Sequence, residues 1–189
     1  PLVVGELVLL TAAVADELGL PLTYQKGVDA PDTSQGPPPD VEIDWRVLAY
    51  DLASGAPRWS ASAGKAKPKF PIHPSNTHAS ETPAADEHGV YAYFGSTGTV
   101  AAFDLAGKAL WKVELGAHPT QDAFGTGTSP VLFERKLFVQ VFSEDAGYLV
   151  CLDARDGKEL WRVTRTSGTA WNTPCLWRTA TRTELVTAA

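Results

Sequence analysis

The sequence of 189 residues contains no methionine and only two cysteines. It also lacks the short motifs of several enzyme classes: G-x-S-x-G, H-E-x-x-H, C-x-x-C-H and a glycine loop ending in Gly-Lys-Ser/Thr. Serine hydrolase, zinc protease, c-type haem and nucleotide-loop chemistry are therefore not indicated. Cys151 and Cys175 fall in predicted strands of neighbouring units, where we expect two buried thiols and no disulfide.

The chain also lacks long apolar runs and an excess of basic residues. No run of eighteen apolar residues occurs, so no membrane-spanning helix is expected. The net charge of −6 is spread along the chain, which argues against a nucleic-acid partner. Lys65, Lys67 and Lys69 form a local basic stretch that we interpret as a solvated linker. The 16 glycines and 14 prolines suit a fold with many turns.

What the chain does contain is one pattern repeated three times: VLAYDLASGAPRW, VAAFDLAGKALW and LVCLDARDGKELW. The tryptophans that end it, Trp59, Trp111 and Trp161, are 52 and 50 residues apart. A period near fifty that is built from short β-type segments predicts an all-β protein of radially repeated sheets, a β-propeller.

The clearest unit predicts four antiparallel strands, A to D, joined by tight turns. An apolar stretch before the polar turn at 86–89 is strand A, and residues 90–95, 99–105 and 109–115 are strands B, C and D. The second strand, VYAYFG, is apolar on both faces of its alternation. Such a sheet has to be covered on both sides, as happens when blades stack around an axis.

Each repeat places an aspartate before a glycine turn and a tryptophan after it. We expect the aspartate to accept hydrogen bonds from the turn's N–H groups and the glycine to supply the positive φ. The indole, on the outermost strand, is expected to pack against the neighbouring sheet and to donate its N–H there. A catalytic residue need not recur in every unit, so these residues are interpreted as structural: Asp51, Trp59, Asp104, Trp111, Asp153 and Trp161.

Residues 102–111 and 151–161 resemble the A-x-D-x-x-T-G-K-x-x-W signature of the pyrroloquinoline-quinone (PQQ)-type β-propeller repeats. The family includes quinoprotein alcohol dehydrogenases and the non-enzymatic lipoprotein propeller of the bacterial outer-membrane assembly machine. The first repeat departs from the signature, because Ala56-Pro57 stands where Lys-x is usual. A proline beside a turn on an outer strand is compatible with the fold.

The repeats predict a single partial propeller domain over residues 1–189. Family propellers usually carry seven or eight blades, and about three and a half are expected here, as a fragment of a larger ring. The predicted units are blade 1 at 1–63 with an insertion at 14–43, blade 2 at 80–116, blade 3 at 126–165 and an incomplete blade 4 at 170–189.

The meander also predicts where a binding site lies. A–B and C–D turns share one face of the ring, whereas B–C turns and D–A connections share the other, and the long irregular segments all belong to the second face. Elaborated loops on a rigid scaffold are where binding usually resides. Candidate binding residues at the mouth of the channel on that face are Asn76, His78, Ser80, Glu81, Thr126, Thr128, Trp171 and Asn172.

Other interpretations of these residues stay open. The polar groups ahead of each Ser/Thr-Pro can instead have a structural role and hold the connection between strand D of one blade and strand A of the next by hydrogen bonds. His73, His78 and Glu81 could ligate a metal, although their spacing alone is a weak signal. Glu144 and Asp145 could ligate Ca²⁺, although adjacent acids on a turn are more often solvated.

Two functions compete, and a hydrolase or lyase built on the same scaffold is a third interpretation, because fold does not fix function. The first is a non-catalytic binding or scaffolding propeller of the bacterial envelope, periplasmic, outer-membrane-associated or secreted by resemblance, with a protein or polymer ligand at the channel face. The second is part of a quinoprotein alcohol or sugar dehydrogenase that uses PQQ and Ca²⁺. The resemblance would then imply an adjacent Cys-Cys pair, a stacking Trp, Ca²⁺-ligating acids and a catalytic Asp. No Cys-Cys pair is present and only Trp171 could stack on a planar ring, so the sequence favours the first and predicts neither cofactor nor catalytic residue.

Overall fold

The computed structural model describes residues 1–15, 38, 40–73, 76–166 and 168–188. It is built from strands, with one 3-10 turn, η1 (Gln121–Ala123), and no α-helix among the described residues. The part of the chain that the structure describes holds no helix of the length and apolarity that crossing a membrane requires.

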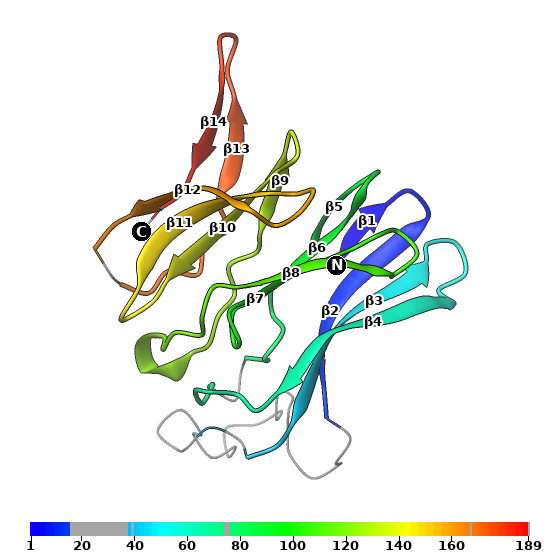
Figure 1. Cartoon of the computed structure of the whole chain (residues 1–189), viewed down its shortest axis with the longest axis horizontal. Coiled ribbons are helices and arrows are strands. Elements are labelled where there is room, and N and C mark those ends of the chain that lie inside the picture. The colour runs from blue at the N-terminus through cyan, green and yellow to red at the C-terminus, as the bar shows by residue number, and fades with distance from the viewer. Residues whose placement is uncertain (16–37, 39, 74–75, 167, 189) are drawn as a thin grey trace.

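The described strands form three four-stranded antiparallel meanders, each in the order A-B-C-D, and one two-stranded hairpin (Figure 1). The fold is therefore an all-β propeller of four-stranded blades, as the repeats predicted. The first blade consists of β1 (Leu2–Val4), β2 (Leu7–Val14), β3 (Ile43–Asp51) and β4 (Pro57–Ala66), and the second of β5 (Ala84–Asp86), β6 (Gly89–Phe94), β7 (Thr99–Phe103) and β8 (Ala109–Glu114). The third blade consists of β9 (Val131–Phe133), β10 (Lys136–Phe142), β11 (Gly147–Asp153) and β12 (Glu159–Thr164). The hairpin consists of β13 (Cys175–Arg178) and β14 (Thr183–Val186).

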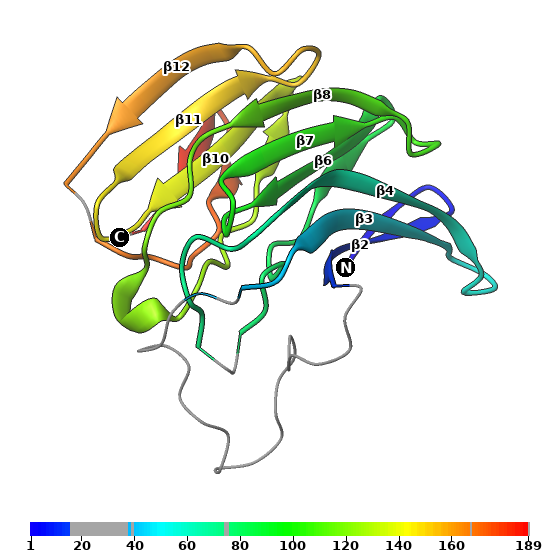
Figure 2. The same ribbon diagram turned by 60° about the horizontal axis from the view of Figure 1, so that its bottom comes forward.

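The sheets stack face to face, and the second blade is covered on both sides (Figure 2). Val90, Ala92 and Phe94 of β6 pack into a core shared with the first blade. Tyr91 and Tyr93 point the other way, into a core shared with the third blade. The side chains on the two faces of this apolar strand therefore fill two separate interfaces between blades. The short A strands lie side by side, since β1 contacts β5 and β5 contacts β9.

Most of the insertion predicted within the first blade, residues 16–37 and 39, lies outside the described residues. The strands that flank it are long. β2 and β3 pair continuously from Leu7 opposite Asp51 to Val14 opposite Asp44. The insertion therefore interrupts the blade at its B–C turn and leaves the sheet intact.

The repeated tryptophans and turns join one blade to the next. The Trp59 indole donates to the Leu105 carbonyl at 2.9 Å, and Trp111 donates to the Ala154 carbonyl at 3.0 Å. Each acceptor lies in the C–D turn of the following blade, so the indole bridges two sheets. Trp161, for which we also expected burial, is 40% exposed and lies on Phe138 of its own blade with ring centroids 5.8 Å apart. No described sheet covers it.

The aspartates hold the C–D turns from within. Asp51 Oδ1 accepts from the Ser54 amide, and Asp153 Oδ1 accepts from the Arg155 amide. Asp104 Oδ1 accepts from the amides of Ala106 and Lys108, both at 2.9 Å. The glycines of these turns have φ values between 70° and 85°, in the left-handed region that L-residues avoid.

A β-bulge before each tryptophan was not foreseen from the sequence. In the second blade Ala102 is opposite Trp111 and Phe103 is opposite Ala109, which leaves Leu110 as the extra residue. The first and third blades shift register at the equivalent point. A bulge bends the strand and re-aims the next side chain. The bulge therefore turns the indole toward the neighbouring blade.

The two cysteines differ from expectation in one respect. Cys151 is buried opposite Trp161 in β11, as predicted, whereas Cys175 at the start of β13 is exposed. Both are free thiols. The expected burial of Cys175 is wrong because the hairpin β13–β14 is largely exposed to solvent.

Candidate binding surface on the long-loop face

The D–A connections and B–C turns leave the blades at the same end, and the short A–B and C–D turns at the opposite end (Figure 2). We call the first end the long-loop face. Its described segments are residues 64–73, 95–98, 115–130, 143–147 and 168–174. The residues predicted to line a channel mouth belong to this face or to the strand starts just beneath it.

Glu81 is the most deeply buried of them. Its side chain is 1% exposed, and Oε1 accepts from the Gly95 amide at 3.0 Å and from the Thr126 hydroxyl at 2.5 Å. Oε2 is buried and has no hydrogen-bond partner among the described residues. Burial raises the pKa of the Glu81 carboxyl, although the hydrogen bond from Thr126 acts in the opposite direction. The direction agrees with the contacts of the carboxyl, because a buried charge whose second oxygen has no partner among the described residues is costly.

Asn76 and Ser80 fasten the first D–A connection to the second. The Asn76 amide group donates to the carbonyls of Phe124 and Thr126, and the Ser80 hydroxyl donates to Asn76 Oδ1. A Cβ on Gly125 would lie 2.7 Å from Asn76 Nδ2, so only glycine allows this approach. Both side chains are engaged within the protein.

The residues of the next connection repeat this arrangement one blade further on. Thr128 donates to the Ala170 carbonyl at 3.3 Å, and the Trp171 indole donates to the Gly125 carbonyl at 2.7 Å. The Asn172 carbonyl accepts from Gln140 at 3.0 Å. The predicted site residues therefore lie in a chain of contacts from blade to blade. Their polar groups mostly hold the D–A connections in place by hydrogen bonds, which is the alternative that the sequence left open.

What this hydrogen-bonded framework presents to solvent is aromatic. Phe124 is 41% exposed and Trp171 is 40% exposed, and their rings meet edge to face with centroids 6.0 Å apart. His73 lies on the other side of Phe124 at a centroid distance of 5.0 Å. We call these three side chains the aromatic row. The sequence analysis placed only Trp171 at a binding surface. It named His73 as a possible metal ligand and did not name Phe124, which stands in an irregular segment with no periodic signal.

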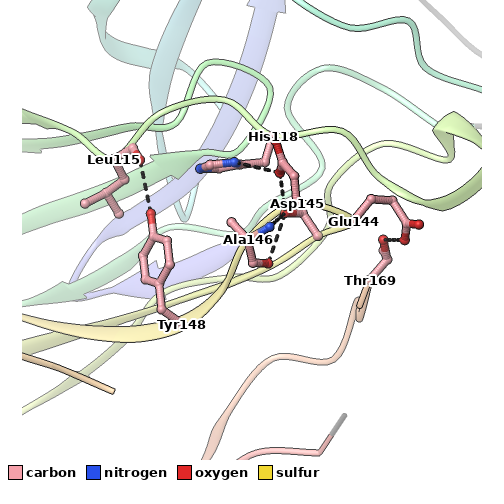
Figure 3. A network of polar contacts seen from close by, with 8 residues as sticks. Leu115, His118, Glu144, Asp145, Ala146, Tyr148 and Thr169 are labelled. Carbon is pink, nitrogen blue, oxygen red and sulfur yellow. Dashed lines mark hydrogen bonds and ion pairs between the residues drawn. The ribbon is translucent and has the colours of Figure 1, made fainter. Parts of the chain in front are cut away.

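A second network holds the outer part of this face (Figure 3). Asp145 Oδ1 lies 2.9 Å from His118 Nδ1 and accepts from the Ser143 hydroxyl. The Thr169 hydroxyl donates to Glu144 Oε1 at 2.7 Å. The serine and the histidine both bond to the aspartate and not to each other, so no base activates a nucleophile here.

Neither metal hypothesis from the sequence matches these contacts. Among the described residues, the only group of three candidate ligands whose atoms lie within 4.8 Å is Asp86, Glu87 and His88 in the β5–β6 turn, on the opposite face. His73, His78 and Glu81 do not converge. Asp86 in that turn accepts from the amides of His88 and Gly89, which is the capping expected of a turn aspartate.

His78 makes the stability of this face depend on pH. It is 2% exposed, packs edge-on against Trp45 and lies 3.3 Å from the Ser96 hydroxyl, and burial lowers its pKa from 6.5 to about 4. The unfolded chain therefore binds a proton at a pH where the folded chain does not. The contribution of neutral His78 to the free energy of unfolding is fully present above pH 6.5 and is lost as the pH falls toward 4.

We expect the His78 contribution to the free energy of unfolding to fall by about 2 kcal/mol between pH 7 and pH 5. Urea unfolding of the wild type and of His78→Gln at both pH values measures it, because the glutamine cannot titrate. The difference between the two pH values should be about 2 kcal/mol smaller in the variant. An equal pH dependence in both proteins would contradict the assignment.

Comparison with known proteins identifies the repeats. Residues 96–178 match the family model described as outer membrane protein assembly factor BamB. This match covers less than half of the chain, and over that part the repeats are similar to those of the PQQ-type β-propeller family. A polyvinylalcohol dehydrogenase from a Pseudomonas species is 32% identical over 134 residues, which cover 62% of this chain and 19% of that protein.

Solved structures with PQQ-type repeats are similar over larger parts of the chain. BamB from Moraxella catarrhalis is 22% identical with a TM-score of 0.41, over 65% of this chain and 32% of that one. The quinohemoprotein alcohol dehydrogenase from Comamonas testosteroni is 20% identical with a TM-score of 0.43, over 84% of this chain and 23% of that one. The chain thus spans between a fifth and a third of the length of these proteins, and the fold assignment rests on its own sheets.

The side chains on the long-loop face do not fit a PQQ and Ca²⁺ site. Glu81 Oε1 is bonded to Gly95 and Thr126, and Glu144 and Asp145 are bonded to Thr169 and His118 in separate directions. Ca²⁺ requires several carboxylate or carbonyl oxygens that converge on one point. Trp171 offers an exposed ring, but no set of acids among the described residues accompanies it.

Proposed function

We propose that the chain is part of a non-catalytic PQQ-type propeller that binds a protein or polymer partner through the aromatic row on its long-loop face. One observation carries the proposal. Phe124 and Trp171 form an exposed edge-to-face pair, the half-buried His73 contacts Phe124, and the backbone beneath is held by hydrogen bonds from Asn76 and Trp171.

Rigid exposed aromatic side chains are efficient binding anchors. They bury a large area and lose little conformational entropy when a partner orders them. The polar side chains of Asn76, Thr126 and Gln140 near this row are occupied in hydrogen bonds within the protein, and so they support the surface. This division between an aromatic platform and a polar framework favours recognition over catalysis.

The proposal extends to the location and size of the protein. The family model is named for an outer membrane assembly factor, which favours the bacterial cell envelope, in the periplasm or at the outer membrane. The proposal includes a ring of seven or eight blades, of which this chain supplies about three and a half.

A quinoprotein dehydrogenase is the second candidate, and the identity of 32% with a polyvinylalcohol dehydrogenase favours it. In that case the chain would contribute only part of the cofactor site. Trp171 would be the one described residue positioned to stack on the quinone. The two candidates therefore differ in whether PQQ binds and in whether Trp171 matters for that binding.

A titration of the intact protein with PQQ in the presence of Ca²⁺, followed by dye-linked turnover of alcohols including polyvinyl alcohol, decides between them. We expect no saturable PQQ binding and no turnover, either in the wild type or in Trp171→Ala. Saturable turnover in the wild type would replace the scaffold proposal with the dehydrogenase. A loss of PQQ binding in Trp171→Ala would then locate the stacking residue.

A further inference from the structure

A cleft opens between the D strands of the first two blades on the long-loop face. It has a volume of about 220 Å³ and lies between the end of β4 with the residues that follow it, on one side, and β7 and β8 on the other. The buried indole of Trp45 forms part of its lining. The volume is somewhat below the roughly 300 Å³ of the smallest drug-sized pockets, and so suits one charged group and not a whole polymer.

Lysines dominate this cleft. Lys65, Lys67 and Lys69 line it from the first blade and Lys112 lines it from the second. They are half of the eight lysines in a chain whose net charge is −6. The sequence analysis interpreted the first three as a solvated linker. The fold instead brings them to one cleft together with a fourth lysine from the neighbouring blade.

The backbone is shaped to bring Lys112 inward. Gly64 has a φ of 142°, and a Cβ at this position would lie 3.5 Å from the Lys112 ammonium nitrogen. A register shift in the β3–β4 pair occurs beside Gly64. Bulges and strand glycines of this kind commonly mark close approach to another group.

Lys112 is also held in place from its own sheet. Its ammonium lies 3.2 Å from Glu114 Oε1, and Glu114 Oε2 accepts from the Thr99 hydroxyl at 2.9 Å. Thr99 in turn accepts from the Thr97 hydroxyl at 2.9 Å. This chain of donors fixes the carboxylate, and the carboxylate orients the lysine. A cation that is positioned in advance loses less entropy when it binds an anion.

The charges in the cleft are unbalanced. Four lysines line the cleft, and Glu114 is the only acid among the described residues that line it. Lys112 pairs with Glu114, and Lys67 pairs with Asp40, which is 89% exposed. Exposed ion pairs contribute little and yield readily to a competing anion. Ammonium groups that share a cleft repel one another, and a bound multivalent anion relieves that repulsion.

We propose that this lysine cleft between β4 and β8 binds a multivalent oxyanion, a phosphate or a carboxylate cluster. Lys112 and Lys69 contact the anion from opposite blades, and Glu114 positions Lys112 while weakening the binding by its own charge. The site is independent of the proposed function, because it uses neither the aromatic row nor a quinone. The PQQ titration and the test below can each fail without the other.

Isothermal titration of the chain at low salt tests the cleft, with pyrophosphate and tricarballylate as separate probes. Replacing two of the lysines, Lys69→Gln with Lys112→Gln, should weaken binding by about tenfold or more, since charge-assisted contacts are lost. Glu114→Gln should strengthen it by a few-fold, because a competing charge is removed. Lys158→Gln, which removes one positive charge in the β11–β12 turn on the opposite face, should change it by less than about twofold.

A larger effect of the cleft variants than of Lys158→Gln distinguishes a built site from general attraction to a basic surface. A preference for pyrophosphate or for tricarballylate supports the cleft and identifies its preferred group. The proposal is overturned if neither probe binds saturably at low salt. It is overturned equally if Lys158→Gln weakens binding as much as the double cleft variant.

Discussion

Trp111→Ala should lower the free energy of unfolding by about 3 kcal/mol, in the range seen when large aromatic side chains are truncated at well-packed sites. The indole packs against the core shared by the second and third blades, with its ring 6.0 Å from that of Tyr91. Its N–H donates to the Ala154 carbonyl in the next blade. Truncation opens a gap between sheets and leaves that carbonyl without its donor.

The same substitution at Trp161 is the matched control. Trp161 occupies the equivalent strand position and follows the same bulge, but it is 40% exposed. We expect Trp161→Ala to cost about 1 kcal/mol or less. Urea unfolding midpoints of the two variants and the wild type measure the difference. Equal losses at the two positions would show that the indole acts within its own blade and does not join neighbouring blades.

The fold was predictable because its determinants are local and recur. The alternation in VYAYFG assigned Tyr91 and Val90 to opposite faces, and the two cores follow that division. The aspartate, glycine and tryptophan of each C–D turn act within a few residues of one another or on the next blade at a fixed period. Such patterns are visible in the sequence without knowledge of loop geometry.

The candidate surfaces were only partly predictable because they depend on irregular backbone. The long-loop face followed from meander topology, and Trp171 with it. Phe124 and His73 come together through connections of different blades, and the lysine cleft needs Lys112 to meet a segment about forty residues earlier. The register shift beside each tryptophan likewise depends on sheet twist and has no residue signature of its own.

The C–D turns provide a second large effect, from the addition of a single methyl group. Gly157 has a φ of 77°, and a Cβ there would lie 2.7 Å from Trp111 Cε3 and 2.8 Å from Val113 Cγ2. Gly157→Ala therefore combines backbone strain of about 1–2 kcal/mol with a collision that displaces the bridging indole. We expect a total loss of about 3 kcal/mol in the free energy of unfolding, close to that of Trp111→Ala.

Gly55 separates the two contributions. It stands at the same position of the first repeat with a φ of 70°, but a Cβ there would meet no atom within 4 Å. Gly55→Ala should therefore cost only the strain of about 1–2 kcal/mol. In a double variant, Trp111→Ala should remove the collision with the indole and bring the cost of Gly157→Ala closer to the Gly55→Ala value, while the contact with Val113 Cγ2 remains. Additive losses at Gly157 and Trp111 would contradict this, because two residues that share one contact cannot each lose it independently.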